Sequence, residues 1–394
     1  MNAPIALGFG NCIDYEIVWD AAVMAALITD YAIRADELTL HRAINSERDL
    51  VISILSFLQA GIGGERWVAS SAIVEQFSQR FARKITLGGT SVRAAIAMRK
   101  LGYTSALHLV TINEHVRHLI PADSPYVCSN PQESAYPHLI VQFDQGTRVR
   151  AGEIDLCTQR ANRLIYHNDS DNISMPLNRD FAGLIAAAQV LLISGFNAMQ
   201  SEALLCERLA TLVEIMAALP HDAVVFYEDA GFYNPAFHQL IQQQLAGRIT
   251  IFSLNEDELQ GHLGRPLDLL DAAQVRAALA DLQQQLPVPL LVVHTKDWAL
   301  AYGAGAPALA AALKGGVTMA TTRFRYGDDF TVADYEATAA LSPNEAGAAF
   351  ATAIEQLLGD QLCCVPVAQV AQANGITIGL GDAFVGGFLP ALLR

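Results

Sequence analysis

The sequence predicts an α/β fold in which helices cover both faces of a mainly parallel sheet, and three features lead to this prediction. Short, continuous apolar runs, which are typical of strands buried on both faces, recur along the chain. Amphipathic helical patterns lie between these runs, as in βαβ units. The chain has 394 residues, of which 52% are hydrophobic, so it can bury the core of one large domain and a smaller one.

The expected strands begin with Pro4–Ile13, which Asp14 closes. Similar apolar runs follow at Ala106–Ile112, Val190–Ser194, Ala223–Tyr227, Ile249–Leu254 and Leu290–His294. Ligands of open α/β sheets gather at the carboxyl ends of strands, so Asp14 is a candidate for binding a substrate hydroxyl. A turn aspartate is the alternative interpretation of this residue.

Three helices are marked clearly by their sequence patterns. Two of them have one apolar face each, with Leu205, Leu209, Leu212, Met216 and Leu219 in the first and Ala272, Val275, Leu279, Leu282 and Leu286 in the second. The third is expected to have Ser342 as its cap, Pro343 in its first turn, Glu345 completing a capping box, and Gly359 at its end. Strand and helix patterns thus alternate through most of the chain.

The segment from about His138 to His167 has a different pattern. Leu139–Phe143 and Asn162–Tyr166 are strand-like, but polar turns rather than helices separate them. We interpret this segment as part of a small lid inserted into the α/β core, together with the mostly helical residues 15–85. The large domain is therefore expected to comprise residues 1–14, 86–120 and 175–394, and the smaller lid approximately residues 15–85 and 121–174.

Charge and cysteine usage restrict the class of protein. The net charge of -15 disfavours nucleic acid or an anionic membrane as a partner. The six cysteines have no zinc-binding spacing, so free thiols in a reducing compartment are expected. The first residues do not have the pattern of a signal peptide, and no apolar run is long enough to span a membrane. We therefore expect a soluble cytoplasmic protein, and the sequence predicts no oligomeric state.

The strongest local motif is Gly379-Leu380-Gly381-Asp382, which precedes a helix rich in small residues. The glycines allow a tight turn and a close approach of the backbone to a ligand. Free amides at the start of the following helix favour an anion. Asp382 beside them can accept a proton from a substrate hydroxyl, as phosphoryl transfer requires. An aspartate that only caps a helix after a glycine turn is the alternative.

This motif and six other stretches resemble the ADP-dependent glucokinases and phosphofructokinases of the ribokinase-like superfamily. The stretches are, in chain order, Asn11-Cys12-Ile13-Asp14, Gly88-Gly89-Thr90, Arg160-Ala161-Asn162-Arg163-Leu164-Ile165, Ile193-Ser194-Gly195-Phe196, Leu254-Asn255-Glu256-Asp257-Glu258-Leu259, Val293-His294-Thr295 and Gly379–Asp382. They span nearly the whole chain. The resemblance implies a three-layer α/β/α core that binds the nucleotide, covered by a smaller lid. It also implies phosphoryl transfer from ADP with Mg²⁺ to a sugar or sugar phosphate, with glucose and fructose 6-phosphate as precedents.

The resemblance also implies a role for individual residues. Asp382 would act as general base, with Gly379, Leu380 and Gly381 forming the anion hole. The implied substrate-binding residues are Asp14, Gly88, Gly89, Asn162 and Arg163; the nucleotide-binding residues are His294 and Thr295; the metal-binding residues are Glu228, Asn255 and Glu258. The chain departs from the family pattern at Phe226, where a His-x-Glu motif has its histidine, and at Thr90, where asparagine is frequent.

Structural explanations exist for these residues as well. The glycine pair suits a helix-entry turn, Arg160 and Arg163 suit a solvated strand face, and Asn255 suits a helix cap. Glu228 and His294 could be ordinary residues at strand ends. Two other functions also stay open at this stage: an ATP-dependent carbohydrate kinase of the ribokinase type, and a protein on the same fold that binds a sugar or nucleotide without turnover. A small-molecule sugar and a nucleotide are the expected partners in each case.

Overall fold

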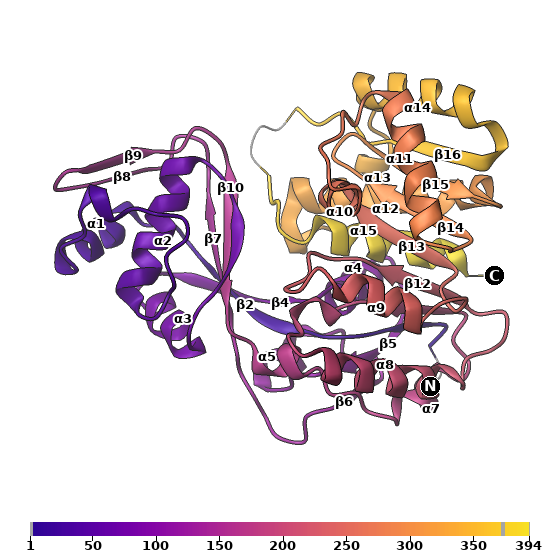
Figure 1. The fold of residues 1–394 in the computed structure, drawn as a ribbon, viewed down its shortest axis with the longest axis horizontal. Coiled ribbons are helices and arrows are strands. Elements are labelled where there is room, and N and C mark those ends of the chain that lie inside the picture. The colour runs from indigo at the N-terminus through magenta and orange to yellow at the C-terminus, as the bar shows by residue number, and fades with distance from the viewer. Residues whose placement is uncertain (1–2, 372–374, 394) are drawn as a thin grey trace.

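In the computed structural model, which describes residues 3–371 and 375–393, the chain forms two lobes, each built on its own sheet (Figure 1). The larger lobe holds both ends of the described chain, and the smaller lobe projects from one side of it. The strands of the larger sheet are, in spatial order, β16 (Leu362–Pro366), β15 (Trp298–Gly303), β14 (Leu290–His294), β13 (Ile251–Asn255), β12 (Val224–Glu228), β11 (Val190–Ile193), β1 (Ile5–Leu7), β5 (Ser105–Leu109) and β6 (Tyr126–Cys128).

The larger sheet is parallel from β14 to β6, and β15 and β16 join it antiparallel. Its helices are α4 (Thr90–Lys100), α5 (Glu114–Leu119), α6 (Ser170–Ser174), α7 (Phe181–Ile185), α8 (Glu202–Met216), α9 (Phe237–Gln244), α10 (Glu256–Leu263), α11 (Ala272–Gln285), α12 (Ala310–Tyr326), α13 (Val332–Ala339), α14 (Glu345–Leu358) and α15 (Leu380–Phe388). Helices pack on both faces, which confirms the three-layer arrangement predicted from the apolar strands.

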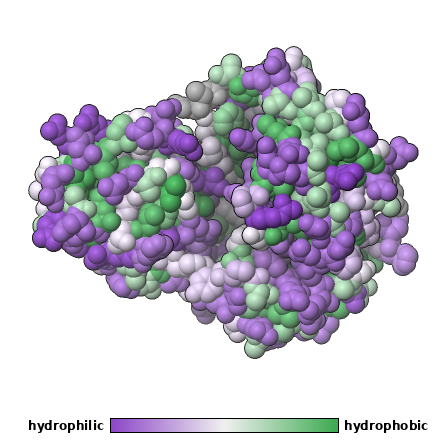
Figure 2. All heavy atoms as spheres, turned by 45° about the horizontal axis from the view of Figure 1, so that its top comes forward, coloured by the Kyte–Doolittle hydropathy of each residue, from purple (hydrophilic) through white to green (hydrophobic). Residues whose placement is uncertain are grey.

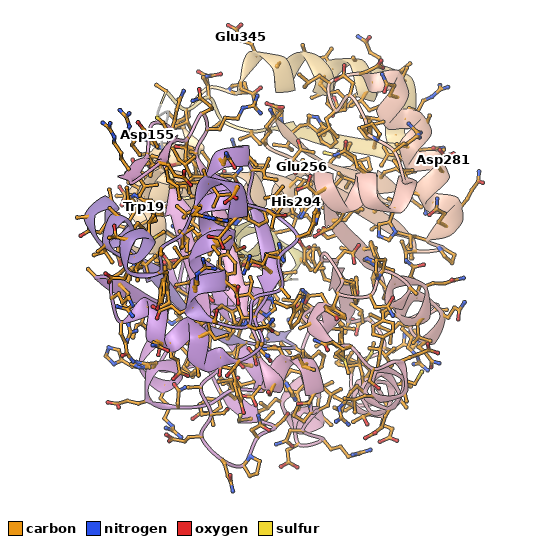
Figure 3. All side chains as sticks on the ribbon, turned by 60° about the vertical axis from the view of Figure 1, so that its left-hand side comes forward. Trp19, Asp155, Glu256, Asp281, His294 and Glu345 are labelled. Carbon is orange, nitrogen blue, oxygen red and sulfur yellow. The ribbon has the colours of Figure 1, made fainter. Side chains whose placement is uncertain are left out.

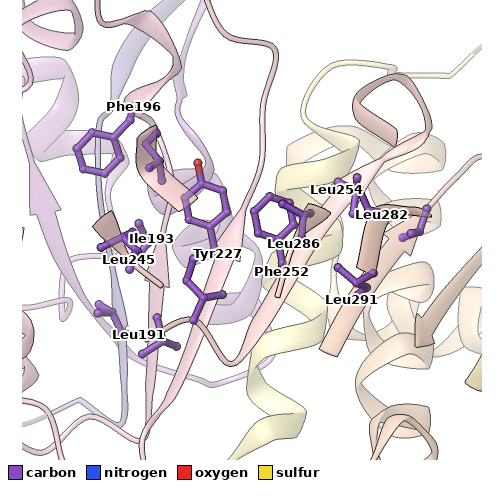
Figure 4. Close-up of a cluster of buried hydrophobic side chains, with 14 of the residues drawn as sticks. Leu191, Ile193, Phe196, Tyr227, Leu245, Phe252, Leu254, Leu282, Leu286 and Leu291 are labelled. Atoms are coloured by element: carbon purple, nitrogen blue, oxygen red, sulfur yellow. The ribbon is translucent and has the colours of Figure 1, made fainter. Parts of the chain in front are cut away.

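Side-chain alternation along the strands divides the core of the larger lobe into two layers. In β11, Leu191 and Ile193 pack under α7–α11 and α14, whereas Val190 and Leu192 pack on the side of α4, α12 and α15. Figure 4 shows part of the first layer, with Leu191 and Ile193 of β11, Tyr227 of β12 and Leu282 of α11 among its buried side chains. Because both of its faces are covered, β11 is apolar at every position.

Within residues 3–371 and 375–393, helices cover only one face of the sheet of the smaller lobe. Its sheet has the order β3 (Gly64–Trp67), β10 (Asn162–His167), β7 (His138–Phe143), β2 (Cys12–Ile17) and β4 (Arg83–Gly88), and β8 (Arg148–Ala151) and β9 (Ile154–Cys157) form a separate hairpin. Helices α1 (Ala21–Asp30), α2 (Glu47–Ala60) and α3 (Ser71–Ser78) share a core with one face of the sheet. The opposite face turns toward the larger lobe.

The structure corrects the predicted first strand. Pro4–Ile13 is not one strand, because the chain leaves the larger sheet after β1 and enters the smaller sheet as β2. Gly10 makes this crossing with φ of 80°, and a Cβ at this position would lie only 2.7 Å from Asn172 Oδ1. Asp14 consequently lies inside β2 of the smaller sheet, not at the end of a strand in the larger one.

Other boundaries also differ from the expectation. β6 lies within residues 121–174, which were expected in the lid, yet it pairs with β5 of the larger sheet. Asn344, not Ser342, caps α14, since its Oδ1 accepts a hydrogen bond from the Gly347 amide. Gly359 follows that helix as predicted. In the described part of the chain, no helix combines the length and apolarity needed to cross a membrane.

The packing of the larger sheet gives a first prediction. Leu191 in β11 is fully buried between strands and helices. Replacing it with alanine removes buried apolar surface and leaves a cavity, so Leu191→Ala should lower the free energy of unfolding by about 2–5 kcal/mol. Leu357→Ala, at a leucine of α14 that is 45% exposed, should change it by less than about 0.5 kcal/mol. Urea unfolding of both variants measures this, and equal losses would contradict the described core.

Candidate active site

A cavity of about 1300 Å³ lies between the two lobes, visible as the hollow between them in Figure 2. Residues at the carboxyl ends of four parallel strands line it: Ser194 after β11, Glu228 of β12, Asn255 of β13 and His294 of β14. The opposite wall is the uncovered face of the smaller sheet. The cavity thus occupies the place where open α/β sheets bind their ligands.

The structure brings together nearly all of the residues singled out in the sequence. Those that line the cavity are Asp14, Gly88, Gly89, Arg163, Glu228, Asn255, Glu258, His294, Thr295, Gly379, Leu380, Gly381 and Asp382. Asn162 is the exception among them. It alternates with Arg163 along β10, and its Oδ1 packs against Gly63 on the other face of the sheet. Arg160 is exposed and is not part of the described cavity wall.

The Gly379–Asp382 motif forms the turn into α15. Gly379 has φ of 67°, and a Cβ there would lie 2.7 Å from Arg93 Nη1, so both conformation and space require glycine. The first backbone hydrogen bond of the helix runs from the Ala383 amide to the Gly379 carbonyl. The amides of Leu380, Gly381 and Asp382 precede it and belong to the unpaired donors of a helix N-terminus. Together with the helix dipole they favour an anion in the cavity.

A buried arginine joins the carboxylates of the cavity. Arg93 of α4 donates from Nη2 to Asp14 Oδ2 at 2.7 Å, and its Nε lies 3.6 Å from Asp382 Oδ2. Glu16 Oε1 is 3.9 Å from the same guanidinium. Burial opposes the charge of Arg93, but Asp14 and Asp382 raise its pKa above the ordinary value. Asp382 is therefore held beside a fixed positive charge with part of its side chain open to the cavity.

A second buried arginine supports the chain before the Gly379 turn. Arg323 of α12 donates from Nε to the Ile378 carbonyl at 2.8 Å and pairs with Asp328 through Nη1. Burial and the nearby charge of Arg93 lower the pKa of Arg323 to about 10, so it still carries its charge at neutral pH. This guanidinium fixes the position of the residue immediately before Gly379.

The glycine pair before α4 lets three segments approach one another. A Cβ at Gly88 would lie 2.7 Å from Asp14 Oδ1, and one at Gly89 would lie 2.9 Å from the Gly10 carbonyl. Gly89 also has φ of 94°. Any side chain at Gly88 would displace the Asp14 carboxylate that Arg93 binds, so the pair is needed to place Asp14 at the cavity wall.

The acidic end of the cavity combines helix capping with unused carboxylate oxygens. Asn255 and Glu258 form a capping box at the start of α10, as the structural alternative predicted. Glu228 Oε1 lies 3.0 Å from His294 Nε2, whereas its buried Oε2 has no hydrogen-bond partner among the described residues. Burial, with the charges of Asp229 and Glu228, raises the pKa of Glu258 well above its ordinary value. A divalent cation bound here would give Glu228 Oε2 a partner and would favour the ionised form of Glu258. Oxygen donors are the ligands that Mg²⁺ prefers.

The side chains of His294 and Thr295 make different kinds of contact. The His294 ring stacks on Phe384 with 4.5 Å between centroids, and Figure 3 shows His294 close to Glu256 in the larger lobe. The Thr295 hydroxyl donates to the Trp298 carbonyl and accepts from the amides of Asp297 and Trp298. It therefore shapes the turn into β15.

Phe226, where the family pattern has a histidine, points into the core against Phe388.

The smaller lobe contributes Arg163, which the sequence singled out, and two histidines, which it did not. Arg163 Nη1 reaches the Thr377 carbonyl at 3.4 Å and so connects the lobes next to the Gly379 turn. His138 and His167 stack with 4.4 Å between ring centroids on the cavity wall. Asp169 lies 3.1 Å from His138 Nε2, and Glu65 lies 2.7 Å from His167 Nε2. Each imidazole thus has a carboxylate partner.

Some cavity residues were not identified from the sequence, and they differ in whether the sequence carries a signal for them. Arg93 follows Gly88-Gly89 by one turn and is the single charged residue in an otherwise small and apolar stretch of α4 from Ser91 to Met98, which is a signal for a buried pair. His138, His167 and Glu65 come from three strands whose adjacency depends on the sheet order, so spacing in the sequence carries no sign of their proximity.

Comparison with known proteins gives one family and one fold. The family model described as "ADP-specific Phosphofructokinase/Glucokinase conserved region" matches residues 3–278. A hypothetical ADP-dependent phosphofructokinase from Pyrococcus horikoshii OT3 has a similar structure, with a TM-score of 0.78 and 17% identity over 99% of this chain and 98% of that one. An ADP-dependent kinase in complex with fructose-6-phosphate and ADPbetaS gives 0.72 and 13% over 98% and 93%. A comparison with curated proteins finds no match.

The raised pKa of Glu258 predicts how stability depends on pH. The folded state holds the proton more tightly than the unfolded state, so the cost of ionising Glu258 is absent below about pH 4 and grows as the pH rises above that value. Without metal, Glu258→Gln keeps an acceptor for the Asn255 amide and should raise the free energy of unfolding at pH 8 by on the order of 1 kcal/mol. No gain is expected at pH 4.

The matched control for this experiment is Glu336→Gln, at an exposed position of α13. Denaturation at pH 4, 6 and 8 should separate the two variants progressively as the pH rises. Loss of stability in Glu258→Gln at pH 8, relative to the parent protein, would show that the ionised carboxylate is stabilising there and would contradict the described environment.

Proposed function

Because the chain belongs to the ADP-specific phosphofructokinase/glucokinase family, whose members transfer phosphoryl groups to hydroxyls, we propose that it phosphorylates a sugar with ADP as donor. The observation that carries this proposal is the convergence of Asp382, the free amides of α15 and the substrate-facing Asp14 in one cavity. A binding protein without turnover has no need of a carboxylate beside an anion hole.

The proposed reaction uses Asp382 as general base. The substrate hydroxyl gives its proton to the Asp382 carboxylate while its oxygen attacks the terminal phosphorus of ADP. A new oxygen–phosphorus bond forms, the bond to the bridging oxygen breaks, and AMP leaves. The amides of Leu380, Gly381 and Asp382 hold the charge on the transferred group. Arg93 fixes the carboxylate that takes the proton and, through Asp14, the wall against which the substrate binds.

The acidic end of the cavity is the proposed place for magnesium. Glu228, Asn255 and Glu258 supply oxygen donors, and the unpartnered Glu228 Oε2 supports a cation there. Bound magnesium would neutralise the nucleotide phosphates. His294, stacked on Phe384, and the Thr295 turn border the proposed nucleotide position. The smaller lobe is the proposed lid, which would exclude water as a competing acceptor.

Charge pairing in the smaller lobe favours a neutral sugar over a sugar phosphate. On that wall, His138 is paired with Asp169 and His167 with Glu65, and Arg93 of α4 reaches the wall only to pair with Asp14. In the described part of this wall, Arg163 has no carboxylate oxygen within 4.0 Å, and it already contacts the Thr377 carbonyl. A second phosphate would need several unpaired cations, whereas hydroxyls pair well with carboxylates and imidazoles. Of the two precedents, glucose therefore fits better than fructose 6-phosphate.

Replacing the proposed base gives the main test of the mechanism. Asp382→Asn keeps the shape of the side chain but cannot take the proton, so kcat should fall by about 10²–10⁴-fold. Thermal stabilisation by ADP and magnesium should remain, because the anion hole is backbone. Asp360→Asn, at an exposed position after α14, is the control and should keep full activity. Retained turnover in Asp382→Asn would rule out this carboxylate as the base.

A donor and acceptor panel tests the proposed substrates. With ADP and magnesium, glucose should yield AMP and a sugar phosphate, and fructose 6-phosphate should have the lower kcat/KM. Product analysis by chromatography measures both. Robust turnover with ATP and none with ADP would contradict the proposed donor. Preference for fructose 6-phosphate would show that the paired cations do accept a second phosphate.

A further inference from the structure

Three side chains with different donor atoms meet on the smaller-lobe wall of the cavity. Cys12 and Asp14 lie two residues apart on β2 and so face the same side of the sheet, and the Cys12 thiol lies 3.4 Å from Asp14 Oδ1. His138 is directly opposite Asp14 in the adjoining parallel strand β7. One ligand atom from each of the three lies within 4.8 Å of the others, and all three residues line the cavity.

We propose that Cys12, Asp14 and His138 bind zinc or a similar thiophilic divalent cation, and that a cation bound there competes with the sugar. A sulfur, an imidazole nitrogen and a carboxylate oxygen are ligands that zinc accepts together, whereas magnesium takes oxygen donors. Three protein ligands leave the fourth position of a tetrahedral cation open to the cavity. This site is separate from the proposed magnesium position, which lies on the larger-lobe wall at Glu228 and Glu258.

The ligands are already held in place by groups around them. Asp169 Oδ2 lies 3.1 Å from His138 Nε2, which leaves Nδ1 as the ring nitrogen for a metal. Asp169 is itself buried and accepts hydrogen bonds from the Asp171 and Asn172 amides and from Asn172 Nδ2. A carboxylate that orients a metal-binding histidine in this way is a usual partner of zinc sites. Arg93 holds the second oxygen of Asp14, so the first stays toward Cys12.

The electrostatic surroundings support a bound cation. Burial, followed by the charges of Asp14 and Asp169, raises the pKa of Cys12 well above its ordinary value, so the free protein holds the thiol protonated. When the sulfur–metal bond forms, that proton passes to solvent. The same two carboxylates attract a divalent cation. The nearby positive charge of Arg93 is shared among Asp14, Glu16 and Asp382 and so does not cancel this attraction.

Competition with the sugar follows from the position of the site, and this part rests on the proposed function. Asp14 is the carboxylate proposed to grip a sugar hydroxyl, and a bound cation would occupy the same oxygen and the space in front of it. Zinc should therefore raise the KM for the sugar with little change in kcat. The KM for ADP should change little, because the anion hole and the acidic end lie on the other lobe.

Cobalt spectroscopy on the substrate-free protein tests binding without any requirement for activity. Cobalt bound to Cys12 should give a thiolate-to-cobalt charge-transfer band and the intense visible bands of tetrahedral coordination, and zinc should displace them. Cys12→Ser should abolish the charge-transfer band and weaken zinc binding by at least about tenfold. Cys157→Ser, at an exposed thiol in β9, is the matched control and should change neither. His138→Gln gives a second test if Cys12→Ser is unstable.

The outcomes separate this proposal from the proposed function. Absence of the charge-transfer band, or an equal band in Cys12→Ser, overturns the metal site whether or not the protein is a kinase. Binding with unchanged sugar KM overturns the competitive effect. Each variant is compared with its own zinc-free rate, so that a direct effect of Cys12→Ser on turnover does not enter the comparison. We expect zinc to raise the KM for the sugar in the parent protein and to leave it unchanged in Cys12→Ser.

Discussion

The buried guanidinium of Arg93 is the interaction on which the rest of the site depends. It connects β2 of the smaller lobe, through Asp14 and Glu16, with α15 of the larger lobe, through Asp382. A buried charge is tolerated only when it is well paired, and loss of one partner leaves the others uncompensated. The planar fork of arginine can serve several carboxylates at fixed angles, which a lysine cannot do. The proposed base and the proposed substrate carboxylate are therefore positioned by one cation.

Backbone packing gives the same region its shape. Gly10, Gly88, Gly89 and Gly379 lie where a side chain would collide with a neighbouring segment or with Arg93. The chain crosses between the lobes at Gly10 and turns into α15 at Gly379, both with positive φ. Asn255 and Glu258 show that one group of residues can serve two purposes, since they cap α10 and also face the cavity with unused oxygen capacity.

Local chemistry was readable from the sequence, and tertiary pairing was not. The apolar strands, the helix that ends at Gly359 and the turn at Gly379 depend on near neighbours in the chain, so periodicity and turn residues predicted them. Residues Pro4–Ile13 divide between two sheets because of what packs around Gly10. The glycines of this segment did not by themselves show that the chain leaves one sheet and enters another. The side chains of Asp14 and His138 meet through the register of β2 and β7. A motif likewise could not say that Asn162 and Arg163 face opposite sides of β10.

The most direct measurement is a crystal structure of the protein with glucose, magnesium and a non-reactive ADP analogue. We expect one sugar hydroxyl within about 3 Å of an Asp382 oxygen, the terminal phosphate against the amides of Leu380, Gly381 and Asp382, and Asp382 still beside Arg93. A complex in which the phosphate lies away from the start of α15, or in which no hydroxyl approaches Asp382, would contradict it.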